Sequence, residues 1–407
     1  MLVPDGWTVE NLENTARVER GKFSNRPRND PQFYGGEIPF IQTGDVSNSG
    51  GRIRTYKQTL NREGLRISKM FPKGTICITI AANIADVGIL EFDSAFPDSI
   101  IGINPNEDII DKTFLFYYLM LQKGLLNNFS VKSTQKNINM GYLNPLPIVI
   151  PPLKEQQKIA AILFNVDDLI FKTQELIDRL HVLKRGLMQK LLTEGIGHTE
   201  FKDTKAGKIP ITWEIKRLTD VIKLSPNYKT PIQDDYIFVP MDAIDTDSMN
   251  ILYFERRTKD KLTNVKFKND DILFARITPS TEHGKGSLIK NLQDPIAFGS
   301  TELVVLSPEK ELILPEFLFF TTKLPHFRSR AVQLMEGATG RQRVSKSFFQ
   351  TQKILHPPKK EQEQIVKILI NIDKKIENEK KYYIQLKEIK KGLMQILLTG
   401  KKRVQLD

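Results

Sequence analysis

Several short motifs in this sequence could take part in catalysis, but each lacks a residue that its chemistry requires. Enzymes that methylate adenine in DNA carry Asn/Asp-Pro-Pro followed by an aromatic residue, whose ring stacks on a flipped base. The Pro-Pro pairs at residues 151–152 and 357–358 are followed by leucine and lysine. The Asn-Pro pair at residues 144–145 is followed by leucine. None of these supplies the stacking ring, so none predicts a methyltransferase site.

Motifs for nucleotides, metals and nucleases are incomplete as well. The Gly-Lys pair at residues 207–208 continues with isoleucine, and Lys202 stands where a P-loop needs its first glycine. Asp98 follows a proline, but no Glu/Asp-x-Lys follows at a spacing that suits a nuclease. Cys77 is the only cysteine, which excludes a disulfide framework, and its apolar neighbours predict a small buried side chain. The five histidines form no metal-ligand pair: His181, His198, His283, His326 and His356. The sequence predicts a binding protein rather than a catalyst.

The charge of the chain points to a polyanionic partner. Its 407 residues include 60 Lys and Arg against 48 Asp and Glu, a formal net charge of +12. This balance favours nucleic acid over a membrane, because no segment is a basic amphipathic anchor. A basic protein with a solvated lysine face stays open as the alternative. No apolar run of eighteen residues and no signal peptide is present, so we expect a cytoplasmic protein without a membrane partner.

Two long stretches repeat each other at a constant offset of 206 residues, from 151–193 to 357–399. A repeat of this length indicates two halves of one design. Apolar residues recur at alternating spacings of three and four, which is typical of a coiled-coil seam. We expect the first seam at Ile159, Ile162, Val166, Leu169, Leu176, Leu180, Leu183 and Leu187, interrupted at Thr173. The second is expected at Ile365, Ile368, Ile372, Tyr382, Leu386, Ile389 and Leu393, with Lys375 and Glu379 in mid-seam. Each helix would be roughly 60 Å long, and the two seams would bury each other in an antiparallel pair.

Gly186 and Gly392 occupy equivalent positions in the two stretches. A glycine inside a helix costs about 1 kcal/mol relative to alanine. Two interpretations remain open at this point. Another backbone, from the sister helix or from a partner subunit, could approach closely there, or the helix could end there.

The segments before the two stretches predict two related globular domains of mixed sheet and helix. Strands are expected at residues 38–41, 74–80, 87–90, 100–103 and 148–150, with one helix at 112–129. Residues 237–242, 271–276 and 316–320 correspond to the first strand, the second strand and the aromatic helix. Trp7 and Trp213 also lie 206 residues apart and are expected to be packing anchors. The aromatic residues at 114–118 and 317–320 have helical spacing and are expected in the core.

The repeated motifs resemble the specificity subunit of type I restriction–modification systems, over nearly the whole chain. The resemblance lies in Pro-Pro-Leu-Lys-Glu-Gln-Gln at 151–157, Gly-Leu-Met-Gln at 186–189, their counterparts at 357–363 and 392–395, the linker 195–201 and the ending 397–401. It implies a non-catalytic subunit that binds double-stranded DNA, with each of two target-recognition domains recognising one half of a split, asymmetric site. It also implies that the helices set the spacer and dock two methyltransferase subunits. S-adenosylmethionine, ATP and Mg are expected on these and on restriction subunits, and no cofactor or metal in this chain.

The fold class that follows is α+β: two mixed α/β recognition domains separated by two long helices that form an antiparallel coiled coil with pseudo-two-fold symmetry. The expected divisions are recognition domain 1 at 1–150, spacer helix 1 at 151–195, the linker and recognition domain 2 at 196–356, spacer helix 2 at 357–401 and a tail at 402–407. Docking of partners is assigned to Gly186, Leu187, Gly392 and Leu393.

Residues that contact DNA are predicted from their types and from their places in loops after strands. Arg and Lys recognise guanine in the major groove, and Asn and Gln recognise adenine. In the second domain the candidates are Arg276, Thr278, Lys285, Arg341, Gln342 and Arg343. In the first they are Asn83, Gln135, Lys136 and Asn137, with Arg52 and Arg54 as phosphate contacts. Solvation, or binding to phosphate alone, is the alternative for each residue. A coiled-coil scaffold whose globular ends bind protein or RNA is the alternative for the whole chain.

Overall fold

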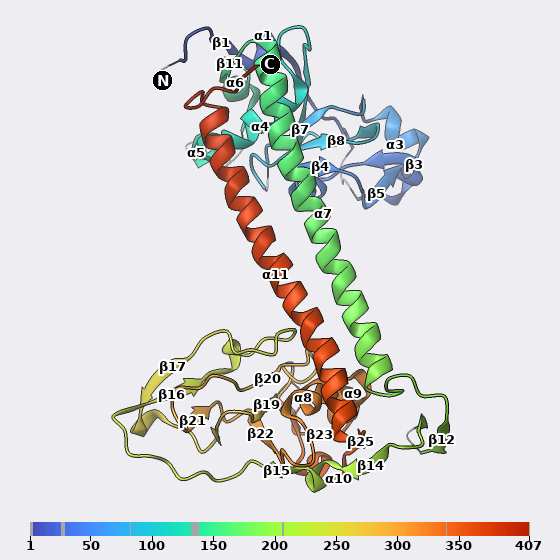
Figure 1. Cartoon of the computed structure of the whole chain (residues 1–407). Helices are drawn as coiled ribbons and strands as arrows, with labels where there is room; N and C mark the ends of the chain where they lie inside the picture. Colours follow the sequence, from blue (N-terminus) through green and yellow to red (C-terminus); the bar gives the residue numbers. More distant parts are fainter. Residues whose placement is uncertain are drawn as a thin grey trace. The chain divides into compact units, whose positions relative to one another are not determined.

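The computed structural model describes residues 3–25, 29–81, 83–131, 138–205, 207–338 and 340–406. The chain divides into two compact units (Figure 1). Unit 1 consists of Met1–Gln174 and Lys381–Asp407, and unit 2 of Glu175–Lys380. The two borders fall within the long helices α7 (Leu153–Leu191) and α11 (Lys359–Leu397), so each unit contains a globular part and one portion of each helix.

Unit 1 is built on two mixed sheets and a short antiparallel pair. The larger sheet has the strand order β2 (Ala16–Arg20), β10 (Ile100–Pro105), β7 (Ile76–Thr79), β8 (Val87–Leu90) and β4 (Arg52–Ile53). The second sheet has the order β5 (Gln58–Leu60), β3 (Tyr34–Phe40), β9 (Ser94–Ala95) and β6 (Met70–Phe71). Strands β1 (Thr8–Asn11) and β11 (Pro147–Ile150) pair antiparallel. Its helices are α1 (Leu12–Thr15), the 3-10 turn Pro31–Phe33, α2 (Thr43–Ser47), α3 (Arg62–Arg66), α4 (Lys112–Leu121), α5 (Lys123–Val131) and α6 (Met140–Leu143).

Unit 2 repeats the order of the strands that the two units share in both multi-stranded sheets. Its first sheet has the order β15 (Ile222–Leu224), β22 (Leu303–Pro308), β19 (Ile272–Ala275) and β20 (Gly286–Leu288), and no strand among the described residues of unit 2 corresponds to β4. Its second has the order β17 (Glu255–Thr258), β16 (Asp235–Val239), β21 (Ala297–Gly299) and β18 (Lys266–Phe267). The antiparallel pairs are β14 (Glu214–Arg217) with β25 (Lys353–His356), β12 (Phe201–Thr204) with β13 (Gly207–Pro210), and β23 (Met335–Glu336) with β24 (Arg343–Val344). Its helices are α8 (Pro315–Lys323), α9 (Pro325–Gln333) and α10 (Lys346–Thr351), with 3-10 turns at Leu218–Asp220, Met241–Ala243 and Lys259–Lys261.

Most local expectations are confirmed, and one helix is corrected. The predicted strands of unit 1 correspond to β3, β7, β8, β10 and β11. The aromatic residues of α4 and α8 are buried, and so is Cys77. The single helix predicted at 112–129 is instead two helices that meet at Gln122, whose N–H donates to Tyr118 O at 3.1 Å. Gly124, a weak helix former, lies two residues after this junction.

The Pro-Pro-x-x-Glu-Gln motif fastens the start of each long helix to its own unit. The amide of Gln156 accepts from the Asp111 N–H at 2.7 Å and donates to the carbonyls of Ile109 and Pro151. Glu155 accepts from the indole N–H of Trp7 at 3.1 Å. These bonds satisfy polar groups that are buried at the base of the helix.

The same contacts recur in unit 2. Gln362 accepts from the Leu314 N–H at 2.9 Å, and Glu361 accepts from the indole of Trp213 at 2.8 Å. Trp7 and Trp213 are buried, which confirms them as packing anchors. The motif therefore recurs because each helix start needs the same set of hydrogen bonds.

Within each unit the portions of α7 and α11 run antiparallel. In unit 1, Ile159 near the start of α7 shares a core with Met394 and Leu397 near the end of α11. In unit 2, Leu191 at the end of α7 shares a core with Ile365 near the start of α11.

On each long helix, part of the buried stripe lies one residue further along the chain than the seam that the sequence predicts. On α7, Leu176 is 38% exposed, whereas the next residue, Ile177, is 4% exposed. On α11, Lys375 is exposed and pairs with Glu379 at 2.7 Å, while Ile376 is buried. Besides Leu176, four predicted seam residues are exposed: Leu169, Leu183, Tyr382 and Ile389. Where two apolar residues are adjacent, as at Leu176 and Ile177, spacing alone fits both stripes.

Candidate nucleic-acid interface

In unit 2 the fold brings the predicted DNA-contacting residues of two loops together. The loop after β19 begins at Arg276, whose carbonyl accepts from the Val344 N–H at 2.7 Å. Thr278 donates its N–H to the Gln342 carbonyl at 3.0 Å, and the Gln342 N–H donates to the Thr278 hydroxyl at 2.9 Å. These backbone bonds fix two segments that are more than sixty residues apart in the sequence.

One carboxylate, that of Glu302, pairs with Arg343 and feels the charges of two further arginines. Arg343 forms a two-point ion pair with Glu302, at 2.8 Å from Nε and 2.5 Å from Nη2. The hydrogen bond from Arg343 lowers the pKa of Glu302, and the charges of Arg276 and Arg341 lower it further. Within the described residues, the Nε of Arg276 is buried without a partner. One carboxylate cannot neutralise three guanidinium groups, so this surface suits phosphate or guanine.

Lys285 follows the same loop but uses its ammonium group internally. Its Nζ donates to the Met241 carbonyl at 3.0 Å. Its N–H donates to the Ser280 carbonyl at 2.9 Å, which closes the loop on itself. Lys285 would therefore have to break its hydrogen bond to Met241 before its ammonium group could contact DNA.

In unit 1 the two arginines predicted to contact phosphate lie against helix α7. Arg52 pairs with Glu91 at 2.5 Å, and its guanidinium lies 4.6 Å from the ring centre of Phe164. Arg54 is exposed, and its guanidinium lies 4.3 Å from the ring centre of Phe171. Sequence spacing gave no sign of these partners.

The other candidates of unit 1 are only partly described. Asn83 is exposed, and its carbonyl accepts a hydrogen bond from the Thr79 hydroxyl. Gln135, Lys136 and Asn137 lie outside the described residues. The next residue, Ile138, donates its N–H to the carbonyl of Ile80 after β7 at 3.2 Å. In unit 2 the Val344 N–H bonds the carbonyl of Arg276 after β19 in the same way.

The residues predicted to dock partners fall into two kinds. A Cβ added at Gly186 or Gly392 would meet nothing within 4 Å, and both helices continue past these residues. The interpretation as a helix end is therefore wrong, and among the described residues no atom of the sister helix lies close to the Cβ position of either glycine. Leu187 and Leu393 are partly buried against the cores of their own units.

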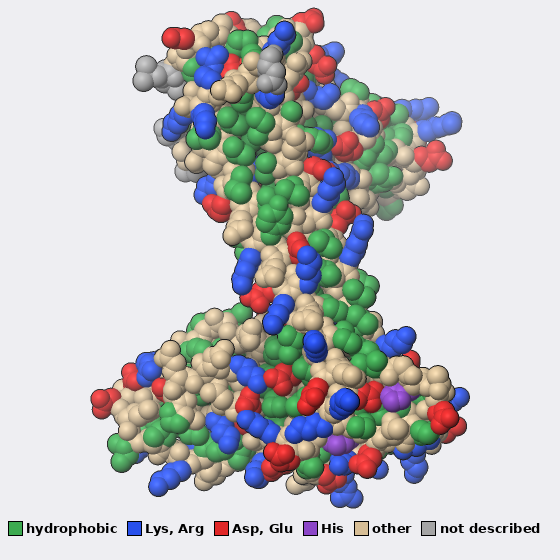
Figure 2. All heavy atoms as spheres, in the orientation of Figure 1, with side chains coloured by type: hydrophobic (Ala, Val, Ile, Leu, Met, Phe, Trp, Pro, Cys, Tyr) green, Lys and Arg blue, Asp and Glu red, His purple; other side chains and the backbone are tan. Residues whose placement is uncertain are grey.

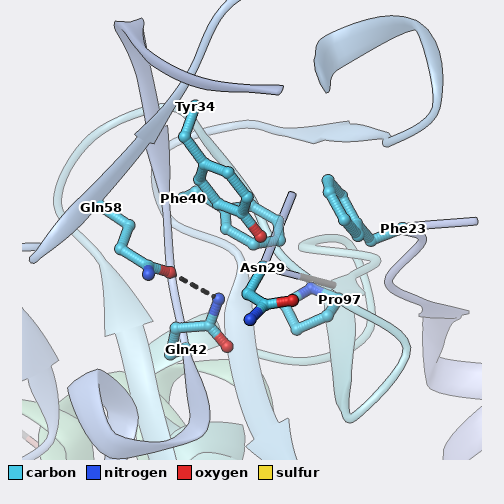
Figure 3. Close-up of a pocket in the computed structure, with 7 residues that line it drawn as sticks. All are labelled: Phe23, Asn29, Tyr34, Phe40, Gln42, Gln58 and Pro97. Atoms are coloured by element: carbon cyan, nitrogen blue, oxygen red, sulfur yellow. Dashed lines mark hydrogen bonds between the residues drawn. The ribbon is translucent and has the colours of Figure 1, made fainter. Parts of the chain in front are cut away.

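Unit 1 also contains a pocket that the sequence did not reveal. The pocket measures about 290 Å³ (Figure 3), and its lining residues are Phe23, Asn29, Tyr34, Phe40, Gln42, Gln58 and Pro97. The Gln42 amide donates to the Gln58 carbonyl oxygen at 2.9 Å. Rings beside amide groups offer stacking and hydrogen bonds of the kind that bases accept. Its lining comes from positions far apart in the chain, so no motif marks it.

Charge is distributed in a mixed pattern. Figure 2 shows basic and acidic side chains interspersed on the visible face, with hydrophobic side chains among them along the long helices. Within the described parts of the chain, no group of three or more His, Cys, Asp or Glu residues could hold a metal ion. None of the described helices is long and apolar enough to cross a membrane.

Known proteins share this architecture and this repeat. The family described as type I restriction modification DNA specificity domain matches the chain twice, at residues 4–181 and 210–388. The putative type I restriction enzyme MjaX specificity subunit of Methanocaldococcus jannaschii is 27% identical over 99% of this chain and 95% of its own length. The MjaVIII specificity subunit of the same organism is 27% identical over 75% of this chain and 74% of its own length.

A solved structure gives the same result for the fold. The S subunit of a type I restriction–modification system from M. genitalium aligns with a TM-score of 0.58 and 15% identity, over 100% of this chain and 99% of that one. The family match covers both repeats, each with its globular part and most of a long helix. The chain therefore belongs to the family of type I restriction–modification DNA specificity subunits, which recognise DNA sequence.

Proposed function

We propose that the chain is the non-catalytic subunit of its complex, and that each unit recognises one half of a split DNA site. The observation that carries this proposal is the repeat itself: two units share their strand order but differ in the loops that follow β7 and β19. A common frame with different polar loops suits two different base sequences. The site is accordingly asymmetric.

The candidate DNA contacts are better defined in unit 2 than in unit 1. Arg276 and Arg341 contribute positive charge near the Arg343–Glu302 pair. An arginine that contacts guanine typically contributes about 1–3 kcal/mol of discrimination. Arg341→Ala should therefore change or abolish methylation at the site while the subunits still assemble. Unaltered methylation at low enzyme concentration would remove Arg341 from the interface.

The long helices are proposed to set the distance between the half-sites. A helix rises about 1.5 Å per residue, and half-sites recognised from one face of DNA lie roughly 34–36 Å apart. Four residues added at 193–197 would lengthen the preferred spacer by roughly one to two base pairs. In unit 2 this junction is held by the Ile196 N–H, which donates to Glu361 at 3.0 Å. The insertion therefore belongs before Ile196, and an unchanged spacer would refute the proposal.

Two methyltransferase subunits are proposed to dock on the exposed apolar positions of the helices. Leu176 and Leu183 of unit 2 correspond, at an offset of 206, to Tyr382 and Ile389 of unit 1, and all four are exposed. Equivalent apolar positions in two repeats suit two copies of one partner.

Aspartate substitutions test this docking surface directly. Leu183→Asp and Ile389→Asp should each remove one methyltransferase subunit from the purified complex, as measured by mass. Ile232→Asp is the matched control, because Ile232 is fully exposed and lies in the loop between β15 and β16 rather than on a long helix. Full occupancy in both helix variants would contradict the docking surface.

The partners would bring the chemistry that this chain is proposed not to perform. Methyltransferase subunits would supply S-adenosylmethionine, and restriction subunits would supply ATP-driven translocation and cleavage with Mg. The chain itself is proposed to contribute recognition of double-stranded DNA and the geometry of the assembly, in the cytoplasm.

The experiment that tests the proposed function is a map of modified adenines in the host genome with and without this gene. A split, asymmetric motif that disappears on deletion and returns on complementation is the expected result. The alternative, a scaffold for protein or RNA, predicts that methylation is the same in both strains.

A further inference from the structure

Two cations of unit 2 lie in helices whose other buried residues are mostly apolar. Lys323 ends α8, and its Nζ donates to three backbone carbonyls. The distances are 3.0 Å to Thr246, 2.8 Å to Gly284 and 3.0 Å to Gly286. All three ammonium protons are thereby used, and two of the acceptors flank Lys285.

Arg328 of α9 completes the arrangement from the next helix. It is 7% exposed, and its Nε donates to the Thr322 carbonyl at 2.7 Å. Its Nη1 donates to the Lys285 carbonyl at 3.2 Å, and its guanidinium lies 4.1 Å from the ring centre of Phe274. Three consecutive carbonyls, at residues 284–286, therefore accept hydrogen bonds from the two cations.

Burying these two charged side chains lowers the stability of the folded state. Burial lowers the pKa of Lys323 to about 7 and that of Arg328 to about 9. The neighbouring charges of Arg328 and Lys184 lower the pKa of Lys323 further, and Asp245 and Asp247 oppose this. An apolar side chain would avoid the cost.

Unit 1 has such an apolar side chain at the corresponding place. Asp111 and Leu314 are equivalent helix starts, because each donates its N–H to the buried glutamine of its unit. Nine residues further along, α4 has Met120 where α8 has Lys323. Met120 lines a pocket of about 200 Å³ in unit 1. The frame therefore folds without a cation at this position.

We propose that Lys323 and Arg328 are positioning residues for DNA recognition by unit 2: they hold the backbone at residues 284–286, where the loop after β19 enters β20, so that this loop presents one conformation to the bases. The inference rests on the proposed function of unit 2. Because both cations act on the backbone, they define the shape of the loop whatever side chains it carries. Lys323 also bonds Thr246, so it ties a second loop to the same point.

The test is a methylation assay on a pool of DNA duplexes randomised in each half of the split motif. The enzyme is the full complex of this chain with its methyltransferase partner, and the methylated pool is sequenced. Lys323→Met should lower base discrimination at least about fivefold in one half of the motif and leave the other half unchanged. Lys323→Arg, which keeps the charge and the donors, should retain discrimination. Arg328→Lys, which keeps the charge but fewer donors, should give an intermediate loss.

Two further variants separate the possible outcomes. Lys290→Met is the matched control, because Lys290 pairs with Asp270 and Glu316 in the same unit and holds no loop carbonyl by a described bond. An equal loss of discrimination in Lys290→Met would overturn the positioning role, and so would a lower melting temperature of Lys323→Met with unchanged discrimination. Arg341→Ala reports on the proposed DNA-contacting surface of unit 2. A changed half-site in Arg341→Ala with none in Lys323→Met overturns only the positioning role, whereas no change in either overturns the positioning role and also removes Arg341 from the interface.

Discussion

The ion pair between the two long helices of unit 2 gives a prediction whose size follows from the structure. Lys184 of α7 lies 2.5 Å from Asp373 of α11, and the two side chains are 13% and 23% exposed. Lys390 and Asp167 form the equivalent pair in unit 1 at 2.6 Å. Replacing Lys184 by methionine leaves a partly buried carboxylate without its ion-pair partner, and at the low end of the range for buried pairs this costs about 3 kcal/mol.

The loss should be visible as a lower melting temperature of unit 2. For a unit of about 200 residues each kcal/mol corresponds to about 2–4 °C, so Lys184→Met should melt roughly 6–12 °C lower. The double variant Lys184→Met, Asp373→Leu removes both charges and should recover most of the loss. Thermal unfolding followed by calorimetry measures both variants.

The destabilisation of Lys184→Met is expected to change with pH in a definite direction. Burial raises the pKa of Asp373, while the Lys184 charge opposes that rise. Without Lys184 the pKa of Asp373 rises further, and the folded state disfavours the charged carboxylate more strongly. The destabilisation should therefore be full above the raised pKa and should decrease as pH falls through it. A single variant as stable as the wild type, or a double variant as unstable as the single one, would refute this reasoning.

Three further predictions concern other parts of the chain. Trp213→Phe removes the indole bond to Glu361 and should cost about 1 kcal/mol in unfolding free energy; an unchanged urea midpoint would contradict the role of that bond. Glu302→Gln releases Arg343 from its ion pair and should steepen the salt dependence of nonspecific DNA binding by about one unit of logarithmic slope, measured by titration at several salt concentrations. Burial lowers the pKa of Lys323 to about 7. The charged ammonium group therefore destabilises the folded state fully below pH 7, and this destabilisation decreases as pH rises toward the ordinary pKa of lysine. The wild type should therefore gain stability relative to Lys323→Met over that range, and parallel pH curves would contradict it.

The sequence predicts the frame of this protein well because the frame is repeated. An offset of 206 residues joins both Pro-Pro-x-x-Glu-Gln motifs and both tryptophans, and the structure gives each pair the same hydrogen bonds. The seam is less predictable, because adjacent apolar residues such as Leu176 and Ile177 satisfy the same periodicity. Only packing determines which of the two is buried.

From the sequence, candidate DNA contacts can be selected only because they lie in loops that follow predicted strands. Arg276 and Gln342 could be selected as loop residues, and the fold joins their segments. Arg52 could not be assigned correctly to a partner, because Glu91 and Phe164 lie far from it in the sequence. Lys323 carries no motif, since its function depends on carbonyls of loops that are distant in the chain.

The central claim is that each unit recognises its own half of one split site. It is tested most directly by finding out which half of the DNA motif depends on unit 2. Adenine modification should be mapped in cells that express the partner subunits with either the wild-type chain or a chain carrying Arg276→Ala and Arg341→Ala. The account predicts that one half of the motif changes or relaxes while the other half and the spacer stay the same. Equal changes in both halves, or a motif that does not respond at all, would contradict it.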